Sequence, residues 1–508
     1  MLCPTISSAK SSRVWSVWIF GSLVTLSGLS CILGTFYDDE IYNIRQAALS
    51  FPNLLEHIKY INSTDIHPPA SYLLNRLAFR ALGSWKAVQF VNGTLNAAAI
   101  AWFYGRTADN FPQRERLAVA LTLATAVTSQ MWTTSLRWSA YFNPIFLVLY
   151  VVATSTRPSI TARAAILTVG TVFLFHTAYL TAVAAPVLWG TFVATSFQNL
   201  RRRDIRSIAP MLFGGVIACL PQLYVLLKVH LPIYAHGHSF SIPYGFGQSI
   251  SALVVGTAVF PIDYIPVMFA VFLATAFVAS VKNILRDGPV AMLLGGALFG
   301  FALLVLSRLG FEGRNAVFLY PIALILIVLT ICRSVSWIRL PAAATLVLLQ
   351  TMSVYGFVFH RDTVKGSFNT PFAQAMREIA SLSKACPGKS YVFTHDPVLT
   401  YLVEGAGGMV SSPYAPSDVE AHVMHEKDCV LMVVTYRGTL PTEWYAQNVK
   451  PLGSEAFRAI RTIYLGYDRF HTIKSWIANE SFPAYYITIG AYDVLHEVSV
   501  PTWSHLTR

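Results

Sequence analysis

The sequence predicts a polytopic α-helical membrane protein with about eleven transmembrane helices and a small C-terminal α/β domain on the non-cytoplasmic side. Hydrophobic residues make up 54% of the 508 residues and charged residues only 12%, about half the charge of an average soluble domain. Long uncharged runs follow one another through residues 1–359. Basic residues gather between alternate runs. Composition changes at about residue 360, so we expect a transmembrane domain over 1–359 and a soluble domain over 360–508.

The expected spans each approach the roughly 20 apolar residues that a helix needs to cross a bilayer. They cover Val14–Phe36, Ala87–Tyr104, Leu117–Ser135, Phe142–Thr156, two crossings within 164–200, and then 207–227, 264–281, 288–307, 315–332 and 340–359. The first run is interpreted as a retained anchor, because it is too long for a signal peptide and lacks a cleavage signature. Ile250–Phe260 is too short to cross and is interpreted as a re-entrant or interfacial piece. If it did cross, there would be twelve spans, and the orientation downstream would invert.

The basic residues predict the orientation of the chain. With eleven spans, one side receives nearly all of the basic clusters: Lys10/Arg13, Arg106/Arg114/Arg116, Arg157/Arg163, Arg201/Arg202/Arg203/Arg206, Lys282/Arg286 and Arg333/Arg339. The positive-inside rule assigns this side to the cytoplasm. These orientation signals account for the net charge of +12, and we expect no nucleic-acid partner.

The C-terminal region alternates helical and strand-like runs, which is typical of an α/β domain. Pro371–Ala385 and Pro397–Val403 favour helices, and Ser390–Thr394 and Cys429–Thr435 favour buried strands. Cys386 and Cys429 could form a disulfide in an oxidising compartment, or could remain two buried thiols.

Three consecutive acids, Asp38, Asp39 and Glu40, open the first external loop (37–85), directly after the first span. Charged groups beside a membrane span are costly and often functional. A structural explanation is that they precede a helix over Ile41–Leu49, whose N-terminus they stabilise. That explains one or two of them. The functional alternative is a general base with a partner that orients the acceptor.

A second motif, Asp65-Ile66-His67-Pro68-Pro69, follows in the same loop. Its prolines predict the start of a helix over Ala70–Leu82. The pattern of that helix, with Arg76 and Arg80 on its polar side, is typical of a helix lying in the membrane interface. The alternative without a functional role is that His67 is an ordinary polar residue of the loop.

Together, Asp39-Glu40 and Asp65-x-His67-Pro68-Pro69 resemble the GT-C glycosyltransferases, most of all glycosyltransferase family 39. Protein O-mannosyltransferases and the aminoarabinose transferases of lipid A are relatives of that family. Weaker similarities follow in order through residue 330. They are Leu136-Arg137-Trp138-Ser139-Ala140-Tyr141, then His176-Thr177-Ala178-Tyr179, then Arg314 with Tyr320-Pro321.

The resemblance implies an inverting transfer of a sugar from a polyprenyl-phosphate donor to a glycan, lipid or protein acceptor on the outer face of the membrane. It makes Asp39 the base that deprotonates the acceptor, with Glu40 beside it. The additional Asp38 leaves the register open by one residue. His67 stands where the aminoarabinose transferases have a glutamate, so that glutamate's role is not carried over.

A lipid phosphate at the interface requires cations, and arginine suits bidentate phosphate contact. Arg137, Arg308 and Arg314 lie in short external turns and are the expected phosphate-binding residues. Their alternative is to reach lipid head groups or to pair with Glu312. The similarities above add His67, His176 and Tyr141 to the donor site, although His176 could equally be a buried, hydrogen-bonded histidine.

No metal or cofactor is expected with a monophosphate donor, because arginines can neutralise one phosphate. A diphosphate donor would favour a divalent cation held by Asp38, Asp39 or Glu40. We expect an integral protein of the bacterial inner membrane, surrounded by membrane lipids, with its C-terminal domain in the periplasm. The bacterial assignment rests on the absence of the additional lumenal module of the mannosyltransferases.

Two other classes of function compete with a transferase. A lipid or sugar transporter or flippase would place ionisable groups near the midplane and often shows inverted repeats, and no repeat is visible. An assembly or binding protein would act through its C-terminal domain.

Overall fold

The structure is a computed structural model that describes residues 6–33, 38–54, 56, 68, 70–107, 110–126, 134–199, 201–230, 264–306, 317–358, 372–394, 396–411, 429–437, 457–465 and 485–492. The chain divides into two compact units. The helical unit comprises Met1–Leu33 and Asn43–Arg361, and the C-terminal unit comprises Gly34–Tyr42 and Asp362–Arg508.

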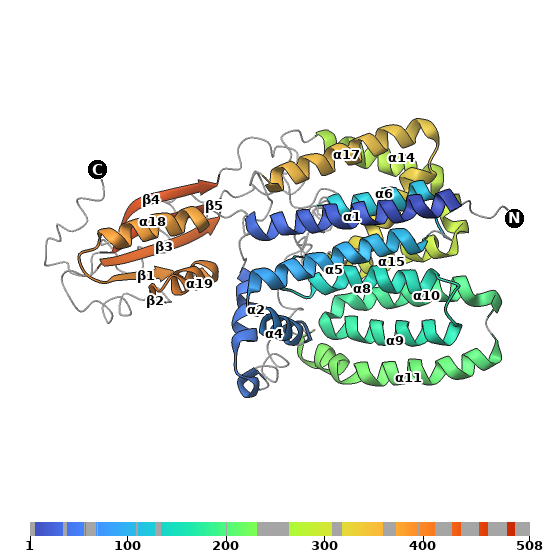
Figure 1. Ribbon diagram of the computed structural model, residues 1–508, viewed down its shortest axis with the longest axis horizontal. Helices are drawn as coiled ribbons and strands as arrows, with labels where there is room; N and C mark the ends of the chain where they lie inside the picture. Colours follow the sequence, from blue (N-terminus) through green and yellow to red (C-terminus); the bar gives the residue numbers. More distant parts are fainter. Residues whose placement is uncertain are drawn as a thin grey trace. The chain divides into compact units, whose positions relative to one another are not determined.

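The helical unit is built from long helices that lie side by side (Figure 1). They are α1 (Ile6–Leu33), α5 (Trp85–Arg106), α6 (Gln113–Thr125), α8 (Ser139–Thr154), α9 (Ile160–Thr177), α10 (Ala184–Ser196), α11 (Arg202–Val225), α14 (Tyr264–Arg286), α15 (Gly288–Leu306), α16 (Tyr320–Arg333) and α17 (Ser336–Val358). A 3₁₀ turn, η2 (Tyr179–Val183), leads into α10, and a π-helical turn, η4 (Leu226–His230), continues α11. Two shorter helices, α2 (Asp38–Ala48) and α4 (Ala70–Leu82), fall within the segment expected as the first external loop.

This is a helical membrane protein, and a helix lies close to each expected span. Four stretches of the described residues are long and apolar enough to cross a membrane: Ile160–Thr177, Tyr179–Ser196, Asp204–Lys228 and Met268–Arg286. The third expected span differs most, because α6 ends at Thr125 and residues 134–138 are not helical. The total of eleven crossings stays a prediction.

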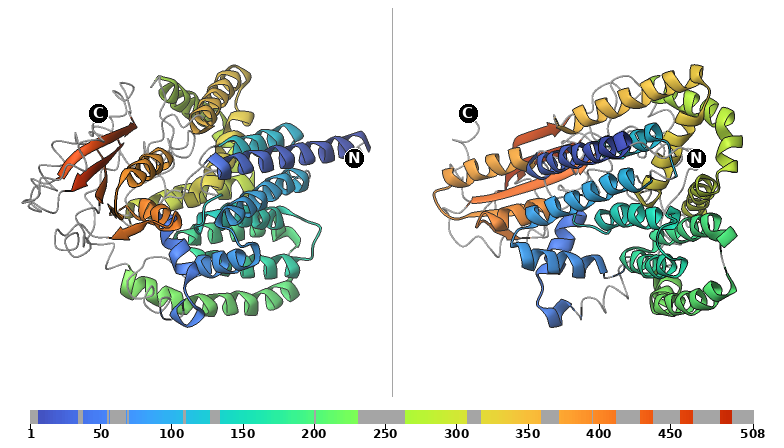
Figure 2. Two further views of the ribbon diagram at one scale, coloured as in Figure 1. Left: turned by 60° about the vertical axis from the view of Figure 1, so that its left-hand side comes forward. Right: turned by 45° about the vertical axis from the view of Figure 1, so that its right-hand side comes forward.

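Helix α11 ends, and α14 begins, on the same side of the helical unit (Figure 2). In the first turn of α9, the Arg163 guanidinium donates to the Val152 carbonyl at 3.0 Å and to the Thr195 hydroxyl at 2.9 Å, which joins the ends of α8 and α10. Gly288 at the start of α15 lies against Ala194 near the end of α10. Residues 231–263, which contain Ile250–Phe260, lie outside the described residues, so the re-entrant or interfacial piece expected there stays a prediction.

Aromatic residues of α8 form a column through the centre of the helical unit. Phe142, Phe146 and Tyr150 are fully buried at intervals of four residues, which places them on one face of the helix. Successive ring centroids lie 5.8 and 6.0 Å apart, and Phe103 of α5 continues the column at 6.4 Å from Tyr150. Offset aromatic contacts of this kind add to the packing of the core.

Helices α10 and α15 pack closely because glycines remove side chains from their interface. A Cβ on Gly296 would lie 1.9 Å from a methyl group of Val187, and a Cβ on Gly190 would lie 2.5 Å from the sulfur of Met292. Small residues commonly let membrane helices approach in this way. The neighbouring Gly295 has no atom within 4 Å of its added Cβ.

We expect Gly296→Ala to destabilise the protein by about 1–3 kcal/mol, because the new methyl group must displace α10 or α15. The matched control is Gly295→Ala, whose methyl group enters open space and should leave stability unchanged or slightly raise it. Thermal unfolding of the two variants in the same detergent measures the difference. Equal losses in both would contradict this account of the interface.

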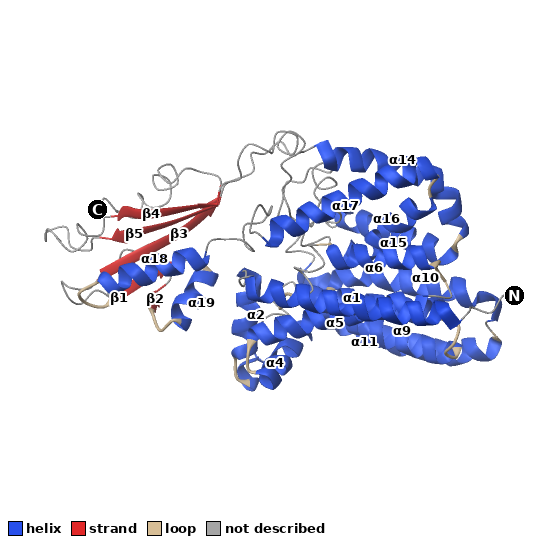
Figure 3. Ribbon diagram, turned by 45° about the horizontal axis from the view of Figure 1, so that its top comes forward, coloured by secondary structure: helices blue, strands red, loops and turns tan. Residues whose placement is uncertain are grey.

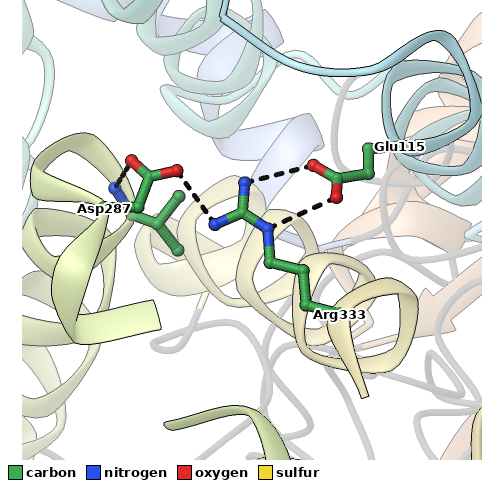
Figure 4. Close-up of polar contacts among 4 residues, drawn as sticks. Glu115, Asp287 and Arg333 are labelled. Carbon is green, nitrogen blue, oxygen red and sulfur yellow. Dashed lines mark hydrogen bonds and ion pairs between the residues drawn. The ribbon is translucent and has the colours of Figure 1, made fainter. Parts of the chain in front are cut away.

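A shared cation joins three chain segments at the end of the bundle assigned to the cytoplasm (Figure 4). The guanidinium of Arg333, the last residue of α16, lies 2.9 Å from Asp287 and 3.1 Å from Glu115. Asp287 separates α14 from α15, and Glu115 lies in the first turn of α6. The predicted grouping of the connections near Arg116, Arg286 and Arg333 on one side is thus confirmed for these segments.

The C-terminal unit contains a five-stranded mixed sheet in the order β2-β1-β3-β5-β4 (Figure 3). Its strands are β1 (Ser390–Thr394), β2 (Met409–Ser411), β3 (Cys429–Arg437), β4 (Phe457–Leu465) and β5 (Tyr485–Tyr492). Strand β1 pairs in parallel with β2 and β3, whereas β5 is antiparallel to β3 and β4. Helices α18 (Phe372–Ala385) and α19 (Pro397–Gly405) contact each other and the sheet. The expected helices and the strands β1 and β3 are confirmed, and β4 and β5 were not predicted.

Cys386 and Cys429 form a disulfide, which resolves the alternative that the sequence left open. Cys386 directly follows α18 and Cys429 is the first residue of β3, so the bond joins the end of the helix to the start of a central strand. The Cys429 amide also donates to the Lys389 carbonyl at 2.8 Å, just before β1. The core of the sheet is therefore cross-linked where its helix and strands meet.

We expect this pair to be oxidised in protein isolated from membranes, because persistent disulfides form in oxidising compartments. The test uses a variant that keeps only Cys386 and Cys429 of the six cysteines, treated with maleimide-polyethylene glycol with and without prior reduction. Two additions should appear only after denaturation and reduction. Labelling of the denatured protein without a reductant would contradict the disulfide.

Candidate functional site

The three acids Asp38, Asp39 and Glu40 form the start of α2. The helix begins three residues earlier than the sequence predicted, so the expectation that the acids precede the helix is wrong. Glu40 is buried, with 1% of its surface exposed. The side chains of Asp38 and Asp39 lie outside the described part of the structure. Carboxylates in a first helical turn are favoured by the partial positive charge there, which is the structural role foreseen for one or two of the acids, and that role stays a prediction.

The last turn of α2 is held by α4. Arg76 donates from Nη1 to the carbonyl of Ala47 at 2.9 Å and to that of Leu49. Carbonyls at the end of a helix generally lack partners within the helix, and a basic side chain commonly satisfies them. Arg76 is buried and Arg80 is exposed. The prediction that both arginines lie on the polar side of α4 is therefore wrong for Arg76.

The environment of Arg76 is that of a buried cation bonded to carbonyl groups. Burial, and secondarily the positive charge of Arg80, lowers the pKa of Arg76. An arginine stays protonated despite such a shift. It therefore continues to donate to α2 at every physiological pH.

Arg137 lies in the non-helical segment 134–138 that leads into α8, and it is 8% exposed. Side-chain amides from two other helices bond the carbonyls just before it. Asn92 of α5 donates to the Ser135 carbonyl at 2.9 Å, and Asn75 of α4 donates to the Leu136 carbonyl at 2.6 Å. The backbone amide of Arg137 donates to the Ser135 hydroxyl at 3.3 Å. The position of this arginine is thus fixed by α4 and α5.

Tyr141 lies one turn after Arg137, in the first turn of α8. Its hydroxyl donates to Asn75 Oδ1 at 2.7 Å. Asn75 therefore bonds both Tyr141 and the Leu136 carbonyl that precedes Arg137. Further along the same helices, Asn143 of α8 donates to Asn96 Oδ1 of α5 at 2.5 Å. The structure therefore joins two of the predicted donor-site residues, Arg137 and Tyr141, through a network of buried amides.

The corner between α4 and α5 sets the positions of Asn75 and Asn92. Gly83 has a φ of 68°, a left-handed conformation that glycine adopts readily, and its amide donates to the Phe79 carbonyl at 2.7 Å. Ser84 then caps α5 by accepting from the Ala87 amide. Phe79 stacks on Trp85 across the corner with ring centroids 4.1 Å apart. These contacts hold α4 and α5 in a fixed orientation to each other.

His176, in the last turn of α9, forms a hydrogen bond between Nε2 and the Ala218 carbonyl of α11 at 3.1 Å. Nearby, Gln222 donates to the Tyr179 hydroxyl at 2.5 Å. His176 is half-buried, and this bond gives it a role in joining α9 to α11.

The remaining predicted donor-site residues, His67, Arg308 and Arg314, lie outside the described residues. Tyr320 and Pro321, the continuation of the motif around Arg314, begin α16, with Pro321 in the first turn. Within the described residues, no group of three or more His, Cys, Asp or Glu side chains could hold a metal ion.

Sequence reasoning missed the amides that hold Arg137. Asn92, which bonds the Ser135 carbonyl, and Asn96, which bonds Asn143, lie inside a largely apolar span, four residues apart and therefore on one face of the helix. Polar side chains inside a membrane span usually face the bundle and serve a function. That signal was present in the sequence.

Comparisons with known proteins add the identity of the fold. No known sequence family and no curated protein matches the chain. Among solved structures, ArnT from Cupriavidus metallidurans in the apo state is similar over 94% of this chain and 98% of its own, with 12% identity and a TM-score of 0.53. ArnT from the same organism bound to undecaprenyl phosphate is similar over 95% and 98%, with 10% identity and a TM-score of 0.52.

This is the GT-C fold. The fold expected from the acidic motifs is therefore confirmed. The arabinofuranosyltransferase AftD from Mycobacteria is also similar over 94% of this chain, with 16% identity and a TM-score of 0.45, although the match covers only 40% of that larger chain.

Proposed function

We propose that this GT-C protein is a membrane glycosyltransferase that moves a sugar from a polyprenyl-phosphate donor to an acceptor hydroxyl on the non-cytoplasmic face. The observation that carries the proposal is the full-length likeness to ArnT, which covers 94–95% of this chain and includes a complex with undecaprenyl phosphate. The acidic motif after the first helix supports it independently. The acceptor is a glycan, a lipid or a protein.

Asp39 is the proposed base. The acceptor oxygen attacks the anomeric carbon while Asp39 takes the hydroxyl proton, and the bond from that carbon to the phosphate oxygen breaks. Polyprenyl phosphate leaves with the bonding electrons, and the configuration at the anomeric carbon inverts. Glu40 and Asp38 lie beside Asp39 in sequence and help to orient the acceptor.

Arg137 is the proposed main contact of the donor phosphate. Arginine matches phosphate geometry with two parallel hydrogen bonds and neutralises the charge that develops on the leaving group. Arg137 is buried at a position set by two amide contacts, which provides the fixed geometry that such stabilisation requires. Tyr141, His176, His67, Arg308 and Arg314 complete the proposed donor site. One phosphate needs no metal, whereas a diphosphate donor would require a divalent cation at the acids.

The distribution of charge favours a transferase over a transporter. Among the described residues of α5, α8, α9, α10, α11, α14, α15, α16 and α17, charged side chains lie only near helix ends. A transporter typically places ionisable groups near the midplane on a path to both faces. We place the enzyme in the bacterial inner membrane with the C-terminal unit in the periplasm.

We expect Asp39→Asn to lower the transfer rate at least ~100-fold, because the amide cannot accept the acceptor's proton. The assay supplies purified protein with a panel of polyprenyl-phosphate sugars and follows the products by mass spectrometry. Glu56→Gln, a change at an exposed carboxylate in the described part of the same loop, is the matched control and should keep full activity. Loss of activity in Asp38→Asn alone would move the base to Asp38. Full activity in both aspartate variants would exclude the mechanism.

We expect Arg137→Ala to weaken binding of undecaprenyl phosphate about 10- to 100-fold, since it removes charge-assisted hydrogen bonds. Arg137→Lys should restore only part of the affinity, because lysine cannot make the bidentate contact. The exposed Arg80 provides the control variant Arg80→Ala, which should bind as the wild type does. Native mass spectrometry of the detergent-solubilised protein measures all four. Wild-type affinity in Arg137→Ala would remove this residue from the donor site.

A further inference from the structure

The non-helical segment 134–138 depends on side chains of α4 and α5 for hydrogen bonds to its backbone. Inside a membrane helix bundle, backbone that leaves the helical conformation loses its internal bonds and must find other partners. Here the carbonyls of Ser135 and Leu136 accept from Asn92 and Asn75, at 2.9 and 2.6 Å. Both asparagines are buried, with exposed fractions of 3% and 0%. The two amides therefore define the path of the chain into α8.

One peptide group in this segment is held from both sides. Its oxygen is the Leu136 carbonyl, which accepts from Asn75, and its nitrogen is the Arg137 amide, which donates to the Ser135 hydroxyl at 3.3 Å. Fixing both atoms fixes the plane of the peptide that carries the Arg137 Cα. Asn75 and Ser135 thus restrain the peptide group from which the Arg137 side chain starts.

Asn75 also determines the position of Tyr141. Its Oδ1 accepts from the Tyr141 hydroxyl at 2.7 Å while its Nδ2 donates to the Leu136 carbonyl. An uncharged amide side chain supplies a donor and an acceptor at two fixed positions, and Asn75 uses both here. The neighbouring Arg76 holds the last turn of α2, so two consecutive residues of α4 join α2 to the Arg137 segment.

We propose that Asn75 is a positioning residue that holds Arg137 and Tyr141 in the arrangement that receives the phosphate of the lipid donor. The inference rests on the proposed function, because it assigns Arg137 and Tyr141 to the donor site. Asn75 acts through these two residues, and it does not contact the donor. Loss of its amide weakens donor binding more than it weakens the fold.

The experiment compares Asn75→Leu, Asn75→Asp and Tyr141→Phe with the control Asn96→Leu. Leucine preserves the shape of Asn75 and removes both hydrogen bonds. Aspartate keeps the acceptor for Tyr141 but faces the Leu136 carbonyl with a carboxylate oxygen. Asn96 is an equally buried asparagine of α5 whose Oδ1 accepts from Asn143 Nδ2, further along α8 than Tyr141. The measurements are the Tm, the Kd for undecaprenyl phosphate, and KM and kcat for the donor.

We expect Asn75→Leu and Asn75→Asp to raise both the Kd for undecaprenyl phosphate and the donor KM about tenfold, with kcat changed less than threefold. Tyr141→Phe should raise the Kd by a smaller factor, since one of the two contacts survives. Asn96→Leu should lower the Tm and leave the Kd unchanged. If Asn75→Leu does not fold, Asn75→Asp and Tyr141→Phe give the result.

Two outcomes separate this inference from the function on which it rests. Wild-type Kd and KM in the Asn75 variants, with binding lost in Arg137→Ala, would overturn the positioning role alone. Equal effects of Asn75→Leu and Asn96→Leu on Kd would also overturn it, because they would reveal a general packing defect. Wild-type binding in Arg137→Ala would instead reject the donor site itself.

Discussion

The need to satisfy every backbone polar group inside a membrane bundle governs the site proposed here. Long helices meet this need by themselves, but the chain between α6 and α8 is not helical at residues 134–138. Side-chain amides from α4 and α5 instead donate hydrogen bonds to the carbonyls of Ser135 and Leu136. The irregular backbone that carries Arg137 is thus held by donors from those two helices. Fold and site therefore depend on the same few hydrogen bonds.

The helical unit combines a polar network at each end with an apolar middle. At one end, Arg333 bridges Glu115 and Asp287. At the other, the amides around Asn75 hold the Arg137 segment. The buried aromatic column of α8 lies between them. The polar hydrogen bonds described here thus lie near the two ends of the bundle, and fully buried aromatic side chains of α8 lie between them.

Much of this fold could be predicted because its signals are local. Uncharged runs predicted the long helices, and two prolines before Ala70 predicted α4 with its observed bounds. Contacts between distant segments could not be predicted in the same way. Arg76 looked like a polar-face residue because its partners are backbone carbonyls, which leave no mark in the sequence. Arg333 and Glu115 are 218 residues apart. The proposed site residues Arg137 and Tyr141 were found from a motif, whereas the amide that joins them was not.

The bridge formed by Arg333 has a consequence for how this sequence can vary. One guanidinium pairs with two carboxylates from separate segments, so removing its charge leaves two anions near each other, one of them, Glu115, buried. Removing one carboxylate, by contrast, leaves the cation with a remaining counter-ion. During evolution, a substitution of Arg333 by an uncharged residue should therefore follow, and not precede, the loss of Glu115 or Asp287. Sequences that lack the arginine should also lack at least one of the two acids.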